Sequence, residues 1–497
     1  MMLRIGDEPL APAALAAAAR CGPVDVELAP AARERMARAH ATAEAVAERA
    51  AVYGRTTGVG ANRDVDVGDD LREHTVRLLR SHAGGLGEPL PDEVVRATVL
   101  VRLAQMAAGG GGNRPAVADA LAGLVGDGDD ALPVLRDLGG IGTGDLTVLA
   151  QLALALGGES PREGPAGGGA AAPAAAAAGE HHGAPRLRIA PGDALPFMSS
   201  NAATFAVGLL AWADLRELLD AGHGVAALTF RALEGNPEAF AAPVAAARPL
   251  PGLEAVSAGL RALTAGGPAP ARVQDPFGLR CLPPVAGALD DALAHLHDVL
   301  AVEVNAASEN PLIHAGQVLH HGGFHAATAA LALDGLRLAL VPYASLAGAR
   351  VSHLMAPELS GLARFLAVEA PGASGVLIAE YLVADALARL RAEAVPAVLG
   401  TVAISRGLEE HASFAWQAAW QARRAVAHVR TILALEWVVA ERALRMSAVE
   451  PDGVLAPARA LAAGFAERLE DRPIGTDAAL AAQAIPALAA TVRAVIA

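Results

Sequence analysis

Three side chains with the chemistry of a reactive site lie in short loops of an otherwise apolar chain. Tyr53 lies in the turn VYGRTTGVG, Arg280 ends the segment QDPFGLR, and Glu409 lies in GLEEHASF. A phenol, whose reference pKa is about 10, acts as a base near neutral pH only with help from backbone donors or a nearby positive charge. A planar guanidinium is suited to gripping a carboxylate through paired hydrogen bonds. The residue types therefore suit proton transfer beside a bound carboxylate.

A fourth loop is rich in glycine and contains a single hydroxyl. Between Leu138 and Leu146 it reads Gly-Gly-Ile-Gly-Thr-Gly-Asp, with the hydroxyl on Thr143. Glycine permits strained backbone conformations that other residues rarely adopt. A loop of this composition can therefore adopt conformations that are closed to most sequences.

Helices must position these loops. Apolar residues make up 53% of the 497 residues and aromatic residues only 3%, which is typical of Ala/Leu helix packing rather than of strands. We expect a mainly α fold: a loop-rich helical part over residues 1–190, which carries the Tyr53 and glycine-rich loops, and an elongated helical bundle over residues 191–497. The two parts are expected to share a core. The Ala/Gly/Pro-rich stretch 160–185 has no periodicity and is interpreted as a mobile loop.

Composition excludes several classes of function. The net charge of −14, without a basic run, argues against nucleic acid and anionic membranes as partners. The most apolar windows contain Asp and Arg, so we interpret them as buried helices rather than membrane spans. Two cysteines and an N-terminus without a secretion signal predict a cytoplasmic protein. The chain contains no lysine, which excludes a pyridoxal-phosphate Schiff base, a lysine-dependent aldolase and a P-loop.

Taken in order along the chain, these loops resemble those of the aromatic amino acid ammonia-lyase and aminomutase family, and histidine ammonia-lyase matches best. The resemblance also includes SHAGGLG, EVNAASENP and GFHA, and extends from about residue 45 to about residue 415. It implies a helical homotetramer with active sites built from loops of different subunits. It also implies a built-in electrophile, methylideneimidazolone (MIO), formed autocatalytically from an Ala-Ser-Gly tripeptide.

The resemblance fails where the electrophile should form. The tripeptide is replaced by Gly142-Thr143-Gly144, and the loop is one residue shorter than in the family. Threonine would leave a hindered alkene carbon in place of an open methylene. The family's supporting asparagine aligns with DALPFMSSN, which places Met198 at its position. We therefore predict that MIO does not form and that no other cofactor replaces it.

Other site residues are carried over from the family one by one. Tyr53 matches the tyrosine that removes the β-proton, Arg280 the arginine that binds the substrate carboxylate, and Glu409 a carboxylate near the substrate amine or ring. His82 lies where the family sorts substrate rings, and a Ser-His pair there is typical of the histidine enzymes. The resemblance also assigns Gln274, Phe277 and Asn305 to substrate binding, with Phe277 in place of the usual tyrosine.

Three hypotheses follow. The first is a lyase-type enzyme without MIO that uses Tyr53 and Arg280 for elimination, isomerisation or conjugate addition on an activated, amino-acid-derived carboxylate. The second is a histidine or aromatic amino acid ammonia-lyase whose prosthetic group derives from Thr143. The third is a non-catalytic binding or structural subunit. Neither His181-His182 nor His320-His321 has a carboxylate partner at a metal-ligand spacing, so no metal site is predicted.

Overall fold

The computed structural model describes residues 1–159, 186–368, 372–447, 453–465 and 468–496. These are mainly helical, which confirms the predicted fold class. The stretch 160–185, with His181 and His182, lies outside the described residues.

The chain forms two compact units, each assembled from three segments. Unit 1 contains residues 1–210, 297–331 and 396–420, and unit 2 contains residues 211–296, 332–395 and 421–497. This division differs from the expected boundary at residue 190. The reason is that four long helices continue from one unit into the other: α8 (Ala202–Ala232), α12 (Leu282–Glu303), α13 (Ala327–Met355) and α16 (Ala415–Met446).

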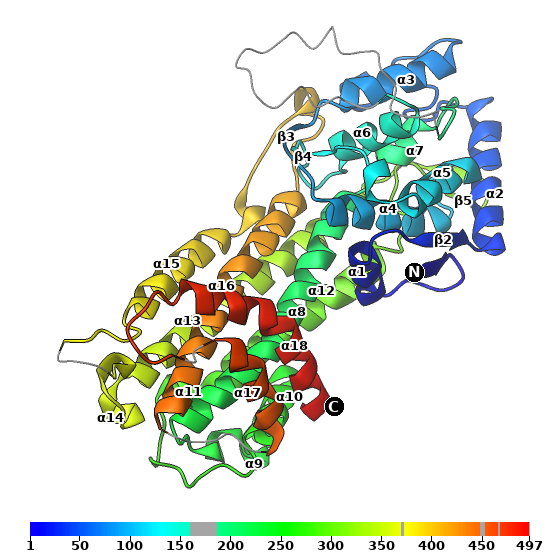
Figure 1. Ribbon diagram of the computed structural model, residues 1–497. Helices are drawn as coiled ribbons and strands as arrows, with labels where there is room; N and C mark the ends of the chain where they lie inside the picture. Colours follow the sequence, from blue (N-terminus) through cyan, green and yellow to red (C-terminus); the bar gives the residue numbers. More distant parts are fainter. Residues whose placement is uncertain (160–185, 369–371, 448–452, 466–467, 497) are drawn as a thin grey trace, which may run out of the picture. The chain divides into compact units, whose positions relative to one another are not determined.

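Unit 1 is organised around a buried helix, α4 (Asp92–Ala107). Every residue of α4 from Val94 to Ala107 is buried, and its first turn carries Asp92 and Glu93, which suit the positive end of a helix. It packs against α1 (Pro12–Arg20), α2 (Pro30–Ala47) and α5 (Pro115–Gly126). Figure 1 shows α4 within this group of blue and cyan helices.

A second group of unit 1 helices supports the glycine-rich loop. Helix α3 (Leu71–His82) begins where the Asp70 side chain accepts a hydrogen bond from the Glu73 N–H, and it packs against α6 (Leu146–Leu156). The apolar helix α6 follows the loop directly and also packs against α7 (Ala194–Met198). Short 3₁₀ helices lie at Gly60–Asn62, Asp129–Ala131, Ala397–Leu399 and Ser405–Gly407.

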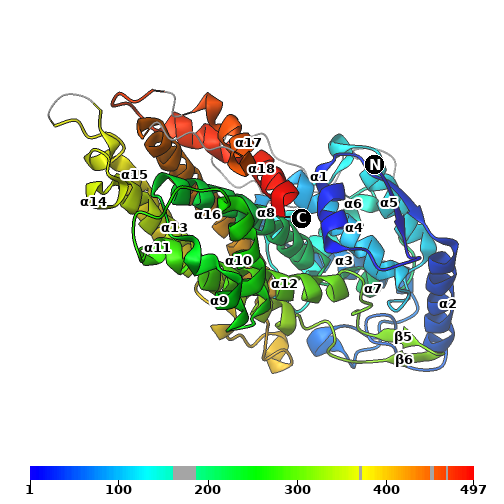
Figure 2. The ribbon, with the colours of Figure 1, turned by 90° about the horizontal axis from the view of Figure 1, so that it is seen from below.

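In the described part of the chain, the strands form three small two-stranded sheets. Strand β1 (Met2–Ile5) is parallel to β2 (Asp25–Leu28), and β3 (Leu86–Pro89) is antiparallel to β4 (Arg136–Leu138). A hairpin joins β5 (Leu312–His314) to β6 (Gln317–Leu319), with Leu312 opposite Leu319. Ile313 and Val318 pack this hairpin onto Ala39 and Ala43 of α2, and Figure 2 shows the two side by side.

Most residues of the four helices that continue through both units lie in unit 2. Its other elements are α9 (Ala242–Ala246), α10 (Pro251–Thr264), α11 (Phe277–Arg280), α14 (Pro357–Ser360), α15 (Ile378–Glu393), α17 (Ala456–Ala460), α18 (Gly475–Ile496) and 3₁₀ turns at Pro237–Phe240, Arg364–Leu366, Gly453–Leu455 and Leu461–Gly464. A fully buried ion pair crosses its core, where Arg350 on α13 donates to Glu436 on α16 through Nε at 2.6 Å and an η-nitrogen at 2.7 Å. Arg350 also donates to the Gly278 carbonyl at 3.1 Å and so holds α11.

In the ranges that the structure describes, three helical stretches are long and apolar enough to cross a membrane by length and composition. They are Ala194–Ala232, Ala327–Met355 and Gly475–Ile496, and their apolar windows are 94%, 56% and 28% buried within the protein. The apolar windows 202–219 and 329–346, which contain Asp and Arg and are interpreted from sequence as buried helices, lie in the first two of these stretches. The apolar window of the first stretch is almost wholly buried, whereas about half of the window in the second is buried.

Candidate active site

The glycine-rich loop leads from β4 into α6 with three glycines in conformations that favour glycine. The φ angles are +141° at Gly139, +78° at Gly142 and +112° at Gly144. A side chain at Gly142 would also collide, because a Cβ atom there would lie 2.0 Å from Ser413 Oγ and 2.6 Å from the Ala415 nitrogen. Only glycine fits this position.

Hydrogen bonds from the start of α16 hold the loop. The Gln417 side chain donates to the Gly140 carbonyl at 2.8 Å, and the Phe414 N–H donates to the Ile141 carbonyl at 2.9 Å. The Gly142 carbonyl accepts two hydrogen bonds, from Ser413 Oγ at 2.7 Å and from the Ala326 N–H at 3.2 Å. Successive carbonyls of the loop are therefore fixed by groups far away in the sequence.

An amide side chain holds the other end of the tripeptide. Asn201 is 1% exposed, its Oδ1 accepts the Gly144 N–H at 2.9 Å, and its Nδ2 donates to the Phe324 carbonyl at 2.5 Å. Met198, the residue expected to replace the supporting asparagine, is fully buried in α7. The expectation that this loop lacks a supporting amide is wrong, because the turn after α7 brings Asn201, three residues later, to the loop.

Asp145 anchors the end of the loop at the first turn of α6. Its carboxylate is fully buried and accepts hydrogen bonds from the Thr204 N–H and hydroxyl, each at 2.7 Å. Burial raises the pKa of Asp145 to about 6, although the bonds from Thr204 favour the charged form. The Asp145 N–H donates to the Ser200 carbonyl at 2.6 Å, so the turn that carries Asn201 is also tied to the loop.

Tyr53 and Glu409 meet at Gly60. The Tyr53 hydroxyl accepts the Gly60 N–H at 2.7 Å, and Glu409 Oε1 would lie 3.5 Å from a Cβ atom at Gly60. Burial and the negative charge of Glu409 raise the pKa of Tyr53, and burial is the larger effect. The hydrogen bond from the Gly60 N–H and the positive charge of Arg63 lower this pKa, but by less. These contacts favour a neutral phenol in the free site.

His320 lies against the same tyrosine. Its Nε2 accepts the Tyr53 backbone N–H at 3.3 Å, and the two rings meet edge to face with centroids 6.5 Å apart. The neighbouring His321 accepts the Gly323 N–H through Nδ1 and contacts the Glu309 carbonyl through Nε2 at 2.9 Å. Among the described residues, no group of three His, Cys, Asp or Glu side chains is arranged to hold a metal ion.

His82 is half-buried at the end of α3. Its Nδ1 lies 2.8 Å from the Leu78 carbonyl and 3.0 Å from Ser81 Oγ. These contacts are local, and the predicted role in ring recognition stays a prediction.

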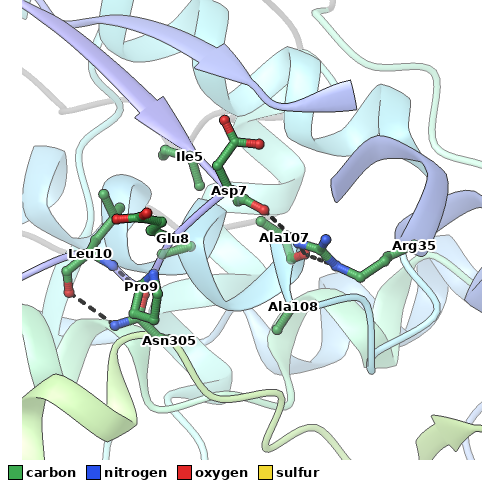
Figure 3. A pocket seen from close by; sticks show the side chains of 11 residues that line it. Ile5, Asp7, Glu8, Pro9, Leu10, Arg35, Ala107, Ala108 and Asn305 are labelled. Atoms are coloured by element: carbon green, nitrogen blue, oxygen red, sulfur yellow. Dashed lines mark hydrogen bonds between the residues drawn. The ribbon is translucent and has the colours of Figure 1, made fainter. Parts of the chain in front are cut away.

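The amide of Asn305, which the resemblance assigns to substrate binding, is hydrogen-bonded within the chain. Its Oδ1 accepts the Leu10 N–H at 2.8 Å, and its Nδ2 donates to the carbonyls of Leu10 at 3.0 Å and Ala301 at 2.9 Å. Figure 3 shows this amide on the wall of a small cavity of about 160 Å³ beside the N-terminal segment. Both ends of the amide are occupied within the chain, and the assignment of Asn305 to substrate binding stays a prediction.

Arg280, Gln274 and Phe277 belong to unit 2, whereas Tyr53, His82 and Glu409 belong to unit 1. The Arg280 guanidinium lies 4.4 Å from the centroid of the Phe277 ring, which is 61% exposed. Arg280 Nε is buried and has no hydrogen-bond partner within the described part of the chain. Gln274 is exposed on the preceding loop.

Asn201 and Ser413 were not among the predicted site residues, although both lie in the quoted stretches DALPFMSSN and GLEEHASF. A histidine pair was not predicted either: His325 Nε2 and His411 Nδ1 are 2.9 Å apart, and the ring centroids are 5.1 Å apart. Partial burial and the neighbouring His411 lower the pKa of His325. The pair joins two segments that bind the Gly142 carbonyl, through Ala326 directly after His325 and through Ser413 two residues after His411.

Comparisons with known proteins agree on one family. The family described as aromatic amino acid lyase matches residues 10–466. The histidine ammonia-lyase of Anaeromyxobacter sp. (strain K) is 37% identical over 91% of this chain and 90% of the relative; that of Symbiobacterium thermophilum is 36% identical over 92% and 90%. A tyrosine aminomutase from Streptomyces globisporus shares the fold with a TM-score of 0.88 at 24% identity, covering 99% of this chain and 98% of that one. Ergothionase from Treponema denticola also shares the fold, with a TM-score of 0.86 at 22% identity, and the match covers 98% of this chain and 99% of that one.

Proposed function

The chain belongs to the aromatic amino acid lyase family, and we propose that it eliminates ammonia from histidine or a related aromatic amino acid, using an electrophilic ring formed from Gly142, Thr143 and Gly144. Relatives named histidine ammonia-lyase support the substrate class, because they match this chain over nine-tenths of its length. They favour this function over the MIO-independent enzyme that the departures in the loop suggested.

The observation that carries the proposal is the way the tripeptide is held. Forming the ring joins the Gly144 nitrogen to the Gly142 carbonyl carbon and expels the Gly142 oxygen as water. That oxygen accepts two hydrogen bonds, and the Gly144 N–H is directed at Asn201 Oδ1. The residues present therefore fit a ring at this place, even though the loop is one residue shorter than the family pattern.

Threonine changes the product of the second dehydration. Loss of the Thr143 hydroxyl with the hydrogen on its Cα would leave an ethylidene carbon instead of a methylidene. In this family the ring supplies an electrophile that makes the amine of the substrate a better leaving group. The extra methyl group hinders attack at that carbon, so we expect a slower enzyme than one with serine at this position.

Other residues of the chain bind the substrate and move its protons. We assign removal of the β-proton to Tyr53 and contact with the substrate amine or ring to Glu409. The charge of Glu409 raises the pKa of Tyr53 in the free protein, so a cationic substrate group beside Glu409 would favour the phenolate. We assign the carboxylate to Arg280, whose Nε is unpaired within the described residues and which would come from a neighbouring copy in a homotetramer.

A second candidate is the elimination or conjugate addition on an activated carboxylate that needs no prosthetic group. The Thr143 side chain favours it, because its hydroxyl makes no hydrogen bond to the residues that the structure describes, so nothing there directs its departure. Tyr53 and Arg280 would have the same roles in this reaction.

The mass of one peptide distinguishes the two candidates. Because the chain lacks lysine, trypsin cuts it only after arginine and releases residues 137–162 with the whole loop. We expect this peptide to weigh two water molecules less than its sequence requires, and only one less in Thr143→Ala, which has no hydroxyl to lose. An unmodified wild-type peptide would refute the ammonia-lyase proposal. Turnover of histidine and aromatic amino acids is then assayed with Tyr53→Phe as the catalytic control.

A further inference from the structure

We propose that Ser413 is a positioning residue that activates the Gly142 carbonyl for ring closure, with the Ala326 N–H as the second donor and Asn201 holding the attacking nitrogen. This inference rests on the proposed function and assigns a step of it to residues that the sequence pattern did not single out.

The Ser413 hydroxyl has one available direction for its proton. Ser413 is 3% exposed, and its Oγ accepts the Ala415 N–H at 3.2 Å while it donates to the Gly142 carbonyl at 2.7 Å. Ala415 is the first residue of α16, a helix of 32 residues, whose N-terminal end is electropositive. The helix end therefore orients the hydroxyl and strengthens it as a donor.

The donors converge on the atom where negative charge develops. When the Gly144 nitrogen adds to the Gly142 carbon, the C=O π pair moves onto the Gly142 oxygen, which then leaves as water with the hydrogens of the Gly144 and Thr143 amides. The ring gains a C=N bond to the Thr143 nitrogen, and no oxidant or reductant is needed. Two preformed donors lower the barrier for such a step because they need no reorganisation as the charge forms.

Asn201 acts on the opposite side of the new bond. Its Oδ1 receives the Gly144 N–H and thereby fixes the direction of the nitrogen, while its Nδ2 is held by the Phe324 carbonyl. Phe324 lies two residues before Ala326, the second donor to the Gly142 oxygen. The segment 324–326 therefore holds the Gly142 carbonyl directly and, through Asn201, the Gly144 nitrogen that must attack it.

The test follows ring closure separately from the loss of the threonine hydroxyl. In a Thr143→Ala background, where closure expels one water molecule, the protein is refolded from denaturant and the mass of peptide 137–162 is followed over time. We expect Ser413→Ala to slow the loss of that water by about 100-fold to 1000-fold, as for removal of one donor from an oxyanion site. Ser413→Thr keeps the hydroxyl and should stay within about tenfold of the parent if the donor is what matters.

A matched control removes a similar hydroxyl elsewhere. Ser345 donates to the Val341 carbonyl at the same distance, 2.7 Å, in unit 2, so Ser345→Ala should leave the rate of water loss unchanged. The unfolding temperature of each variant is measured in parallel. Should Ser413→Ala fail to fold, Ser413→Cys replaces it, because a thiol keeps the volume but is a weak donor.

The outcomes separate this inference from the proposed function. Ring closure at the parent rate in a folded Ser413→Ala or Ser413→Cys protein would overturn the role of Ser413 and leave the ammonia-lyase function intact. A peptide that loses no water in wild type, in Thr143→Ala or in any variant would overturn both.

Discussion

The substitution Gly142→Ala tests the packing of the glycine-rich loop, and the structure allows the expected loss of unfolding free energy to be worked out. An L-residue at φ +78° costs about 1–2 kcal/mol, because its Cβ approaches the following carbonyl oxygen. A Cβ at this position would lie 2.0 Å from Ser413 Oγ, and such overpacking costs about 1–3 kcal/mol more. We expect Gly142→Ala to lower the free energy of unfolding of unit 1 by about 2–5 kcal/mol in total.

The matched control is Gly407→Ala in the same unit. Gly407 has a φ of +83°, but no atom lies within 4 Å of the Cβ it would gain, so only the backbone cost of about 1–2 kcal/mol applies. The difference between the two variants, about 1–3 kcal/mol, measures the collision with Ser413.

Urea denaturation followed by tryptophan fluorescence gives both values. Trp416 suits this measurement, because its indole donates to the Asp137 carbonyl at 2.8 Å and its ring packs against Gly140. Because the collision displaces the Ser413 hydroxyl, the 137–162 peptide of Gly142→Ala should also lose less water than that of wild type. Equal stability of Gly142→Ala and Gly407→Ala would refute the packing of Ser413 against Gly142.

Two further predictions concern unit 2. Arg350→Ala leaves Glu436 charged and without its arginine partner in the core, which should lower the free energy of unfolding by about 3–5 kcal/mol in urea denaturation. The double variant Arg350→Met, Glu436→Leu should recover most of this free energy. Equal losses of unfolding free energy in the single and the double variant would contradict the argument. Burial lowers the pKa of His223 to about 4, so the unfolded chain takes up a proton below its ordinary value of 6.5 while the folded protein does not. The contribution of His223 to stability should therefore fall between pH 6.5 and pH 4 by about 3 kcal/mol. It is measured as the difference between wild type and His223→Gln in denaturation curves at both pH values, because Asp145, whose pKa is raised, contributes with the opposite sign in both proteins.

The sequence determines the fold class and much of the candidate site because both depend on local requirements. A chain rich in Ala and Leu and poor in aromatic residues packs as helices. A loop with glycine at 139, 142 and 144 can take the positive φ angles that the structure has at all three positions. The order of the loops along the chain was sufficient to recognise the family.

Tertiary structure decided which polar side chain lies at which backbone atom. Met198 and Asn201 are three residues apart, and only the turn after α7 decides that the amide of Asn201 reaches Gly144. Asn305 has the residue type of a substrate ligand, yet the N-terminal segment, 295 positions away, occupies its amide.

The bond between Ser413 and Gly142 spans 271 residues of the sequence. No periodicity, spacing or composition encodes such a contact, because it forms only when α16 and the loop after β4 pack together. The sequence alone identified a glycine-rich loop, a tyrosine and a glutamate in a helical member of the aromatic amino acid lyase family. Only the folded chain decided which hydroxyl and which amide hold that loop, because the close packing of distant segments sets the positions of their side chains.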